Sequence, residues 1–128
     1  MQNRKRAAKL LASEARTANT ASARQEDNYN SSVRLYLDVT AVPGAGGLQV
    51  VIRGYDQASG NAVELSAGGR PITQTGTYVY EMRRGPVPEE QAGVIEVTDR
   101  MLPASWDVLV KHGETSSYTY SLSAETAE

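Results

Sequence analysis

The chain has 128 residues and a net charge of −2, so it has room for one domain and a tail but not for two hydrophobic cores. It has no cysteine, which excludes a disulfide framework and a thiolate metal site. No apolar run approaches the roughly 18 residues of a membrane span, and none follows the charged N-terminus as in a secretory signal. We therefore expect a soluble domain that does not contact a membrane.

The first 25 residues are strongly basic. They carry six basic side chains against Glu14 alone, a local charge of +5, which leaves −7 for the rest of the chain. Alanine and leucine recur at three- and four-residue spacing opposite the basic residues, which predicts a helix at residues 3–16, and residues 17–31 are small, polar and without a period. We expect residues 1–31 to form a basic arm, a helix followed by an extended linker. The arm residues expected to contact a partner are Arg4, Lys5, Arg6, Lys9, Leu11, Arg16 and Arg24.

From Ser32 onwards the pattern has a period of two. Every odd position in residues 33–40 is apolar, which predicts a half-buried strand. Turn-forming residues separate further predicted strands at 48–55, 63–65, 77–82, 94–97, 106–110 and 118–122. The last two of these, 106–110 and 118–122, are expected to pair as a hairpin across residues 112–115.

This succession of short strands predicts an all-β fold, an antiparallel β-sandwich or a jelly-roll-like barrel, at residues 32–123. The short basic N-terminal helix and extended arm precede it, and a solvated tail follows at residues 124–128. Tyr36 lies on the polar side of the first strand and is the candidate interface residue of the sheet. The other prominent aromatic residues alternate with polar ones and are predicted to face the core rather than to form a sugar-binding platform: Tyr78, Tyr80, Trp106, Tyr118 and Tyr120.

Reactive groups are sparse in the sequence. The single histidine, His112, has no second histidine or cysteine with which to bind a metal, and we expect it at a turn or strand end. The glycines at 44–47 precede a strand, whereas a phosphate-binding loop needs a helix there. The turn at residues 56–61 lacks the ligand pattern of an EF-hand and is expected to close a hairpin. We predict no catalytic, metal-binding or cofactor-binding residue and no enzymatic activity.

The basic arm has several interpretations. Its charge suits an acidic protein surface or the phosphates of DNA, although no aromatic residue is interleaved for base stacking. Its apolar face is too small to anchor it in a membrane. A solvated tail without a partner is the remaining interpretation. We favour binding to a protein, and nucleic-acid binding is not excluded.

A series of turn and strand motifs, none of them catalytic, runs through residues 29–123. They are Tyr29-Asn30, Leu37-Asp38-Val39-Thr40-Ala41, Gly54-Tyr55-Asp56-Gln57-Ala58-Ser59-Gly60, Ile72-Thr73-Gln74-Thr75-Gly76-Thr77, Leu102-Pro103-Ala104-Ser105-Trp106, Val110-Lys111-His112-Gly113-Glu114 and Tyr118-Thr119-Tyr120-Ser121. In the order and spacing of these motifs the sequence resembles small virion proteins of tailed bacteriophages, which are carried among head and structural genes. The basic segment at residues 3–16 has no counterpart in the pattern of that group.

The resemblance implies a β-sandwich that decorates or cements a phage head. Its partners would then be the major capsid protein and copies of itself on the shell. It would be made in the cytoplasm of the bacterial host and located in the virion. A neck or tail accessory protein and a carbohydrate-binding β-sandwich module are the alternatives.

Overall fold

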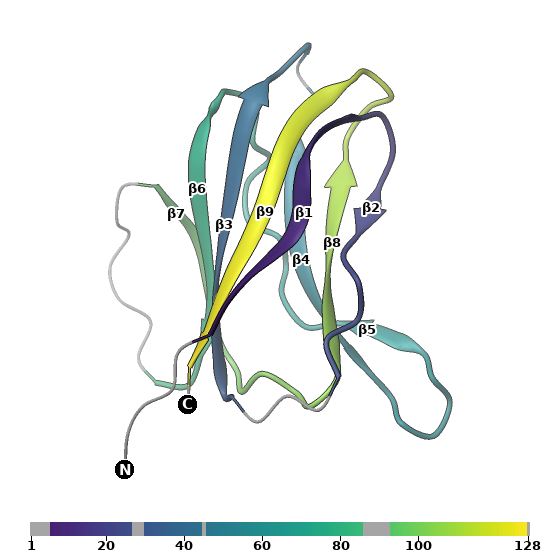
Figure 1. The fold of residues 1–128 in the computed structure, drawn as a ribbon, viewed down its shortest axis with the longest axis vertical. Helices are drawn as coiled ribbons and strands as arrows, with labels where there is room; N and C mark the ends of the chain where they lie inside the picture. Colours follow the sequence, from purple (N-terminus) through teal and green to yellow (C-terminus); the bar gives the residue numbers. More distant parts are fainter. Residues whose placement is uncertain (1–5, 27–29, 45, 86–92, 128) are drawn as a thin grey trace.

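The computed structural model describes residues 6–26, 30–44, 46–85 and 93–127, which form two packed β-sheets (Figure 1). No helix in this part of the chain is long and apolar enough to cross a membrane. The strands are β1 (Arg6–Arg16), β2 (Thr20–Ala21), β3 (Ser32–Ala41), β4 (Leu48–Tyr55), β5 (Ala62–Glu64), β6 (Gly76–Arg83), β7 (Val94–Asp99), β8 (Trp106–His112) and β9 (Tyr118–Ala127).

The larger sheet, sheet A, has the strand order β1-β9-β3-β6-β7, and the smaller sheet, sheet B, has the order β2-β8-β4-β5. All neighbours pair antiparallel except β7, which runs parallel to β6. The all-β prediction is therefore confirmed as a sandwich of two sheets, and the expectation of purely antiparallel pairing is wrong at β7.

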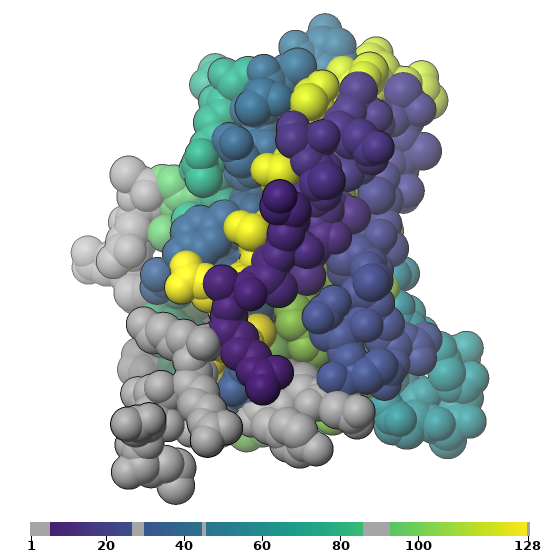
Figure 2. Space-filling model, viewed as in Figure 1, coloured from purple at the N-terminus to yellow at the C-terminus, as the bar shows by residue number. Residues whose placement is uncertain are grey.

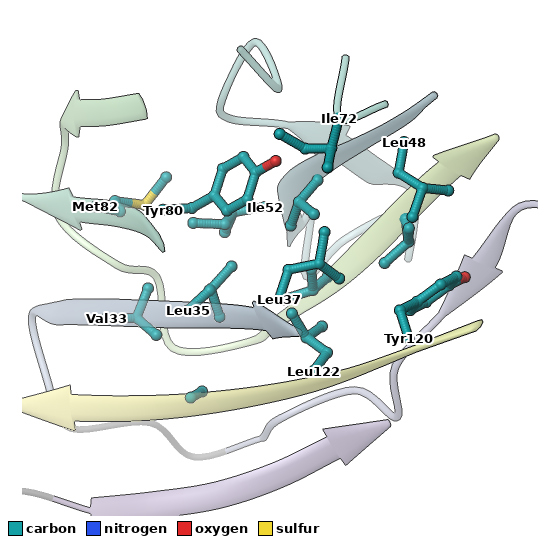
Figure 3. Close-up of a cluster of buried hydrophobic side chains, with 14 of the residues drawn as sticks. Val33, Leu35, Leu37, Leu48, Ile52, Ile72, Tyr80, Met82, Tyr120 and Leu122 are labelled. Atoms are coloured by element: carbon teal, nitrogen blue, oxygen red, sulfur yellow. The ribbon is translucent and has the colours of Figure 1, made fainter. Parts of the chain in front are cut away.

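The core lies between the two sheets and follows the predicted alternation. The odd residues of β3 from Val33 to Val39 are buried, with Leu35 and Leu37 fully inaccessible, while even residues such as Arg34 and Asp38 are exposed. Figure 3 shows these leucines beside Leu122 of β9. Interdigitated side chains from both sheets exclude water, and this apolar burial is the main favourable term in folding.

The predicted helix at residues 3–16 is wrong where the structure describes it, because residues 6–16 form strand β1. This strand pairs with β9 from Arg6↔Thr126 to Arg16↔Tyr118, with two register shifts at Lys9/Leu11 and Leu11/Glu14. Each shift opposes an extra residue of β1 to β9. Such shifts break the period of two that marks a strand in a sequence. The open edge of β9 offers hydrogen bonds that outweigh a modest preference of alanine for helix.

The described part of the predicted extended linker, residues 17–26 and 30–31, also belongs to the sandwich. Thr20 and Ala21 pair with Leu109 and Val110 as strand β2. Farther along, Gln25 and Trp106 exchange backbone hydrogen bonds of 2.7 and 3.1 Å. The chain therefore crosses from the edge of sheet A to the edge of sheet B and closes one side of the sandwich, as Figure 1 shows at β1 and β2.

The predicted hairpin of residues 106–122 is wrong, because β8 belongs to sheet B and β9 to sheet A. Residues 113–117 connect the two sheets instead of turning within one. The predicted tail is also part of the sheet: β9 continues to Ala127, and Ala124 is 3% exposed. Ala124 pairs with both Leu35 of β3 and Ala8 of β1, which leaves no solvated tail within residues 124–127.

Two buried tyrosines provide a test of how polar groups are accommodated in the core. The hydroxyl of Tyr80 has no hydrogen-bond partner among the described residues. The hydroxyl of Tyr118 donates to Glu114 Oε1 (2.6 Å) and accepts from the Gly47 amide (2.7 Å). We expect Tyr80→Phe to leave the free energy of unfolding unchanged or slightly higher and Tyr118→Phe to lower it by about 1–2 kcal/mol, because only the second removes satisfied hydrogen bonds. Urea unfolding of both variants measures the difference, and a larger loss for Tyr80→Phe would contradict it.

Candidate binding face

The outer surface of sheet A combines half-buried side chains with two shallow hollows, and we name it the sheet A face. Its central rows run across β9, β3 and β6, with Glu125, Arg34 and Glu81 in one row and Ser123 and Tyr36 in the next. Figure 2 shows β1, β9 and β3 side by side on this side of the molecule. Because successive strand residues point to opposite faces, the residues that alternate with the core assemble here.

The first hollow has a volume of about 130 Å³ and is formed at the ends of β3, β6 and β9. Glu81 lies on its floor, with one carboxylate oxygen 2.8 Å from Arg34 Nε and the other 3.3 Å from Arg83 Nε. The hydrogen bond with Tyr36 and the charge of Glu81 raise the pKa of Arg34 above its ordinary value. The Glu81 carboxylate therefore orients both arginines before any partner arrives.

The second hollow has a volume of about 350 Å³ and lies between β1 and β3. Tyr36 and Ser123 form part of its lining, Lys9 lines it from β1, and Glu125 is shared with the first hollow. Ala7 leaves space at this wall because its side chain is small. The lining of this hollow thus combines one aromatic ring, one cation and one anion.

The structure brings two of the predicted interface residues together. Lys9 of the basic segment and Tyr36 of the sheet line the same hollow, although they lie 27 positions apart in the sequence. Arg6 is exposed at the start of β1. Arg4 and Lys5 lie outside the described residues.

The other predicted arm residues have intramolecular roles. Leu11 packs against the core. The side chain of Arg16 is only 10% exposed and donates to the Tyr120 carbonyl oxygen at 2.7 Å. Arg24 stacks on Tyr55, with its guanidinium carbon 3.7 Å from the ring centre. These three residues therefore hold the N-terminal segment on the sandwich.

Four residues of the sheet A face were not among the predicted interface residues: Arg34, Glu81, Arg83 and Glu125. Arg34 shares the outward side of its strand with Tyr36, so the alternation already placed both on one face. The pairing of Arg34 with Glu125 and Glu81 depends on the order of β9, β3 and β6, which no local pattern specifies.

No family model matches the sequence, and a search of curated proteins finds no match. A chain in the solved structure of infectious bursal disease virus, Gx strain, aligns with 99% of this protein at 11% sequence identity, with a TM-score of 0.48. This protein spans 32% of that chain. A likeness of this size supports no argument about function.

On the opposite face of the molecule, the outer surface of sheet B, Arg53 and Asp107 form an ion pair. Asp107 is 3% exposed and accepts from Arg53 at 2.8 and 2.6 Å and from the hydroxyl of Tyr55. That hydrogen bond raises the pKa of Tyr55. Since Arg24 stacks on the same ring, the cluster fastens residues 20–26 to sheet B, and its polar groups already have partners.

Four of the five aromatic residues predicted for the core are buried, and Trp106 is 3% exposed. Tyr78 is half-buried against the core and donates to the Gln74 carbonyl oxygen at 2.9 Å. A sugar-binding platform needs exposed rings. The aromatic set therefore does not form such a platform.

The predicted positions of His112, of the glycines at 44–47 and of the turn at residues 56–61 are confirmed. His112 ends β8, and β4 begins directly after the glycines at 44–47. The turn at residues 56–61 connects β4 and β5, with the Asp56 amide donating to the Asn61 carbonyl oxygen at 2.9 Å. Within the described residues, no three histidine, aspartate or glutamate side chains are placed to hold a metal ion.

Proposed function

We propose that this protein is a structural protein of a virus particle, and that it decorates or cements the head of a tailed bacteriophage. In this role it binds the major capsid protein, lies beside copies of itself on the shell and stabilises contacts between capsid subunits. The resemblance of residues 29–123 to small phage virion proteins supports the setting. The observation that supports the mode of binding is the sheet A face, where Tyr36, Lys9 and Glu125 line the same hollow.

The sheet A face has properties that favour docking on a large protein surface. Its floor is a hydrogen-bonded sheet, so little conformational entropy is lost when a partner binds. Tyr36 provides an amphipathic ring of the kind that is enriched at interfaces. Arg34 and Glu81 orient each other at 2.8 Å and present fixed charges for matching a partner. A stable interface buries roughly 800 Å² on each partner, and a sheet face with shallow hollows is suited to such a broad contact.

The proposed role requires no catalysis and no cofactor, and we propose that the protein is not an enzyme. It is made in the bacterial cytoplasm and incorporated into the particle. A neck or tail accessory protein would differ from a head decoration protein in its copy number, because it occupies one ring or a few sites on each particle. Quantitative mass spectrometry of purified particles distinguishes the two. A fixed, high copy number supports the head role, a single ring supports the neck or tail, and absence from particles contradicts both.

Binding through the sheet A face is tested by adding purified variants to particles that lack the protein. We expect Tyr36→Ala to weaken retention on sedimented particles by at least about ten-fold, since a central aromatic anchor contributes 1.4 kcal/mol or more. We expect Lys9→Glu to weaken it as well, because the charge beside Tyr36 is reversed. The measurement is the bound fraction as a function of added protein.

Val63→Ala is the matched control for this experiment. Val63 is an apolar residue that is 52% exposed on β5 of the opposite sheet. This variant should bind as the unmodified protein does, and circular dichroism should show that all variants are folded. Retention of Tyr36→Ala at the level of Val63→Ala would exclude the sheet A face as the docking surface.

A further inference from the structure

His112 lies where the N-terminal segment meets both sheets. It is the last residue of β8, and its backbone amide donates to Asn19 Oδ1 (2.7 Å) in the corner between β1 and β2. Its ring lies edge-on to Tyr118 and within 2.9 Å, through Nε2, of the Tyr120 hydroxyl. The same side chain thus contacts β9 while its backbone holds the corner of the N-terminal segment.

Arg16 fastens the end of β1 at the same place. Its guanidinium lies over the Tyr120 ring, 4.7 Å from the ring centre, and donates to the carbonyl oxygens of Tyr120 (2.7 Å) and Ala12 (2.6 Å). The rest of β1 is held mainly by its backbone pairing with β9, since Leu10 and Leu11 are the hydrophobic side chains of β1 that pack against the core. The Arg16 contacts therefore add to the backbone pairing at the end of a strand whose side chains are mostly exposed.

The site of the His112 ring favours the neutral form. The Nδ1 atom is buried and has no hydrogen-bond partner among the described residues. The neutral tautomer with its proton on Nε2 fits this site, because in that tautomer Nε2 donates to the Tyr120 hydroxyl and Nδ1 is an unprotonated acceptor. A protonated ring carries N–H groups on both nitrogens, so one donor is buried without an acceptor, which is costly.

We propose that His112 is a protonation-controlled latch that holds β1 and β2 on the sandwich when neutral and releases residues 6–21 when it gains a proton. The released segment uncovers the edges of β9 and β8. This inference does not depend on the proposed function, since it concerns only contacts within the chain.

The charged and titratable groups around His112 favour this direction. Arg16 of β1 lies over the ring of Tyr120, and the hydroxyl of the same tyrosine contacts His112 Nε2. A proton on His112 would therefore place a second cation near Arg16. Glu14 is engaged with Arg16 at 3.4 Å, and Glu114 accepts from Tyr118 at 2.6 Å. On β8, Lys111 points to Glu64 at 2.8 Å. The carboxylates near the ring are thus already bound to other groups and do not compensate an imidazolium.

The pH dependence follows from the direction of the pKa shift. Burial and the charge of Arg16 lower the pKa of His112 below its ordinary value of 6.5. At pH values between that folded-state pKa and 6.5, the chain with its N-terminal segment released binds more protons than the chain with the segment docked. The contribution of the latch is therefore fully present above pH 6.5 and is lost as the pH falls through the folded-state pKa of His112.

The test combines proton NMR with amide hydrogen exchange. His112 is the single histidine of the chain, so its ring resonance reports its titration without overlap. Exchange of the β1 amides is measured at pH 7.5 and 5.0, corrected for intrinsic rates and compared with the amides of β3. We expect the protection of the β1 amides to fall at least about ten-fold more than that of the β3 amides between pH 7.5 and pH 5.0. The pH midpoint of this loss should coincide with the midpoint of the His112 titration, below pH 6.5.

Two variants separate the latch from other acid effects. His112→Gln keeps a hydrogen-bonding side chain without a titrating group, and its β1 protection should not depend on pH relative to β3. Arg16→Gln removes the neighbouring cation, and the His112 titration should move up toward 6.5. Persistent acid release in His112→Gln, a wild-type titration at or above 6.5, or an unmoved titration in Arg16→Gln would each overturn the proposal.

Discussion

Replacing Asp107 by alanine is expected to lower the free energy of unfolding by about 3–5 kcal/mol, the usual cost of removing one partner from a buried ion pair. Asp107 is 3% exposed and satisfies two donors of Arg53 and the hydroxyl of Tyr55. Without the carboxylate, the Arg53 guanidinium loses its counter-charge in a site where it is mostly shielded from water. Urea unfolding followed by Trp106 fluorescence measures this loss directly, because Trp106 is the adjacent residue.

Glu64→Ala is the control for that experiment. Glu64 pairs with Lys111 at 2.8 Å in the same sheet, but their side chains are 48% and 36% exposed. Exposed ion pairs contribute about 0–1 kcal/mol, since water and salt screen both charges. Similar losses for Asp107→Ala and Glu64→Ala would show that burial of the Asp107 carboxylate does not determine its contribution.

Leu37→Ala is expected to cost about 2–5 kcal/mol of unfolding free energy, through lost apolar burial and the cavity that remains. Leu37 is fully inaccessible in the middle of β3, which lies between β9 and β6 (Figure 3). Such a loss is large against the 5–15 kcal/mol that stabilises a typical domain. Thermal unfolding followed by circular dichroism measures it.

Met101→Ala is the appropriate comparison for Leu37→Ala. Met101 is 57% exposed, so its truncation removes little buried surface and should change stability by less than about 0.5 kcal/mol. Equal effects of the two substitutions would mean that the space between the sheets is not the packed core of the protein.

The strands of the sandwich were largely predictable from local patterns. In β3 the alternation of Val33, Leu35, Leu37 and Val39 with polar residues has one physical solution, a strand with one face buried and the other exposed. The same alternation placed Tyr36 on the outer side. Turn residues then separated the strands, because glycine and asparagine adopt conformations that interrupt pairing.

The candidate site was only partly predictable. Tyr36 and Lys9 were identified separately, but their meeting in one hollow depends on β1 lying along β9. Strand β1 itself was missed, because its two register shifts remove the alternation and its alanines favour helix in isolation. The sheet that contains each strand was also hidden: β8 and β9 have the same pattern of buried and polar residues whether they pair in one sheet or face each other across the core.

The sequence by itself determined the all-β class, most of the strand segments, the turns, and the side of each strand that faces the core, because these depend on contacts between near neighbours and on apolar periodicity. The tertiary structure alone decided the partners of β1, β2, β8 and β9, and with them the sheet A face and the His112 latch. Those features depend on which distant edges meet, and an open strand edge accepts any backbone that reaches it with suitable geometry. The free energy that favours one pairing of strand edges over another comes from the whole packed core, so it cannot be inferred from any single segment of the sequence.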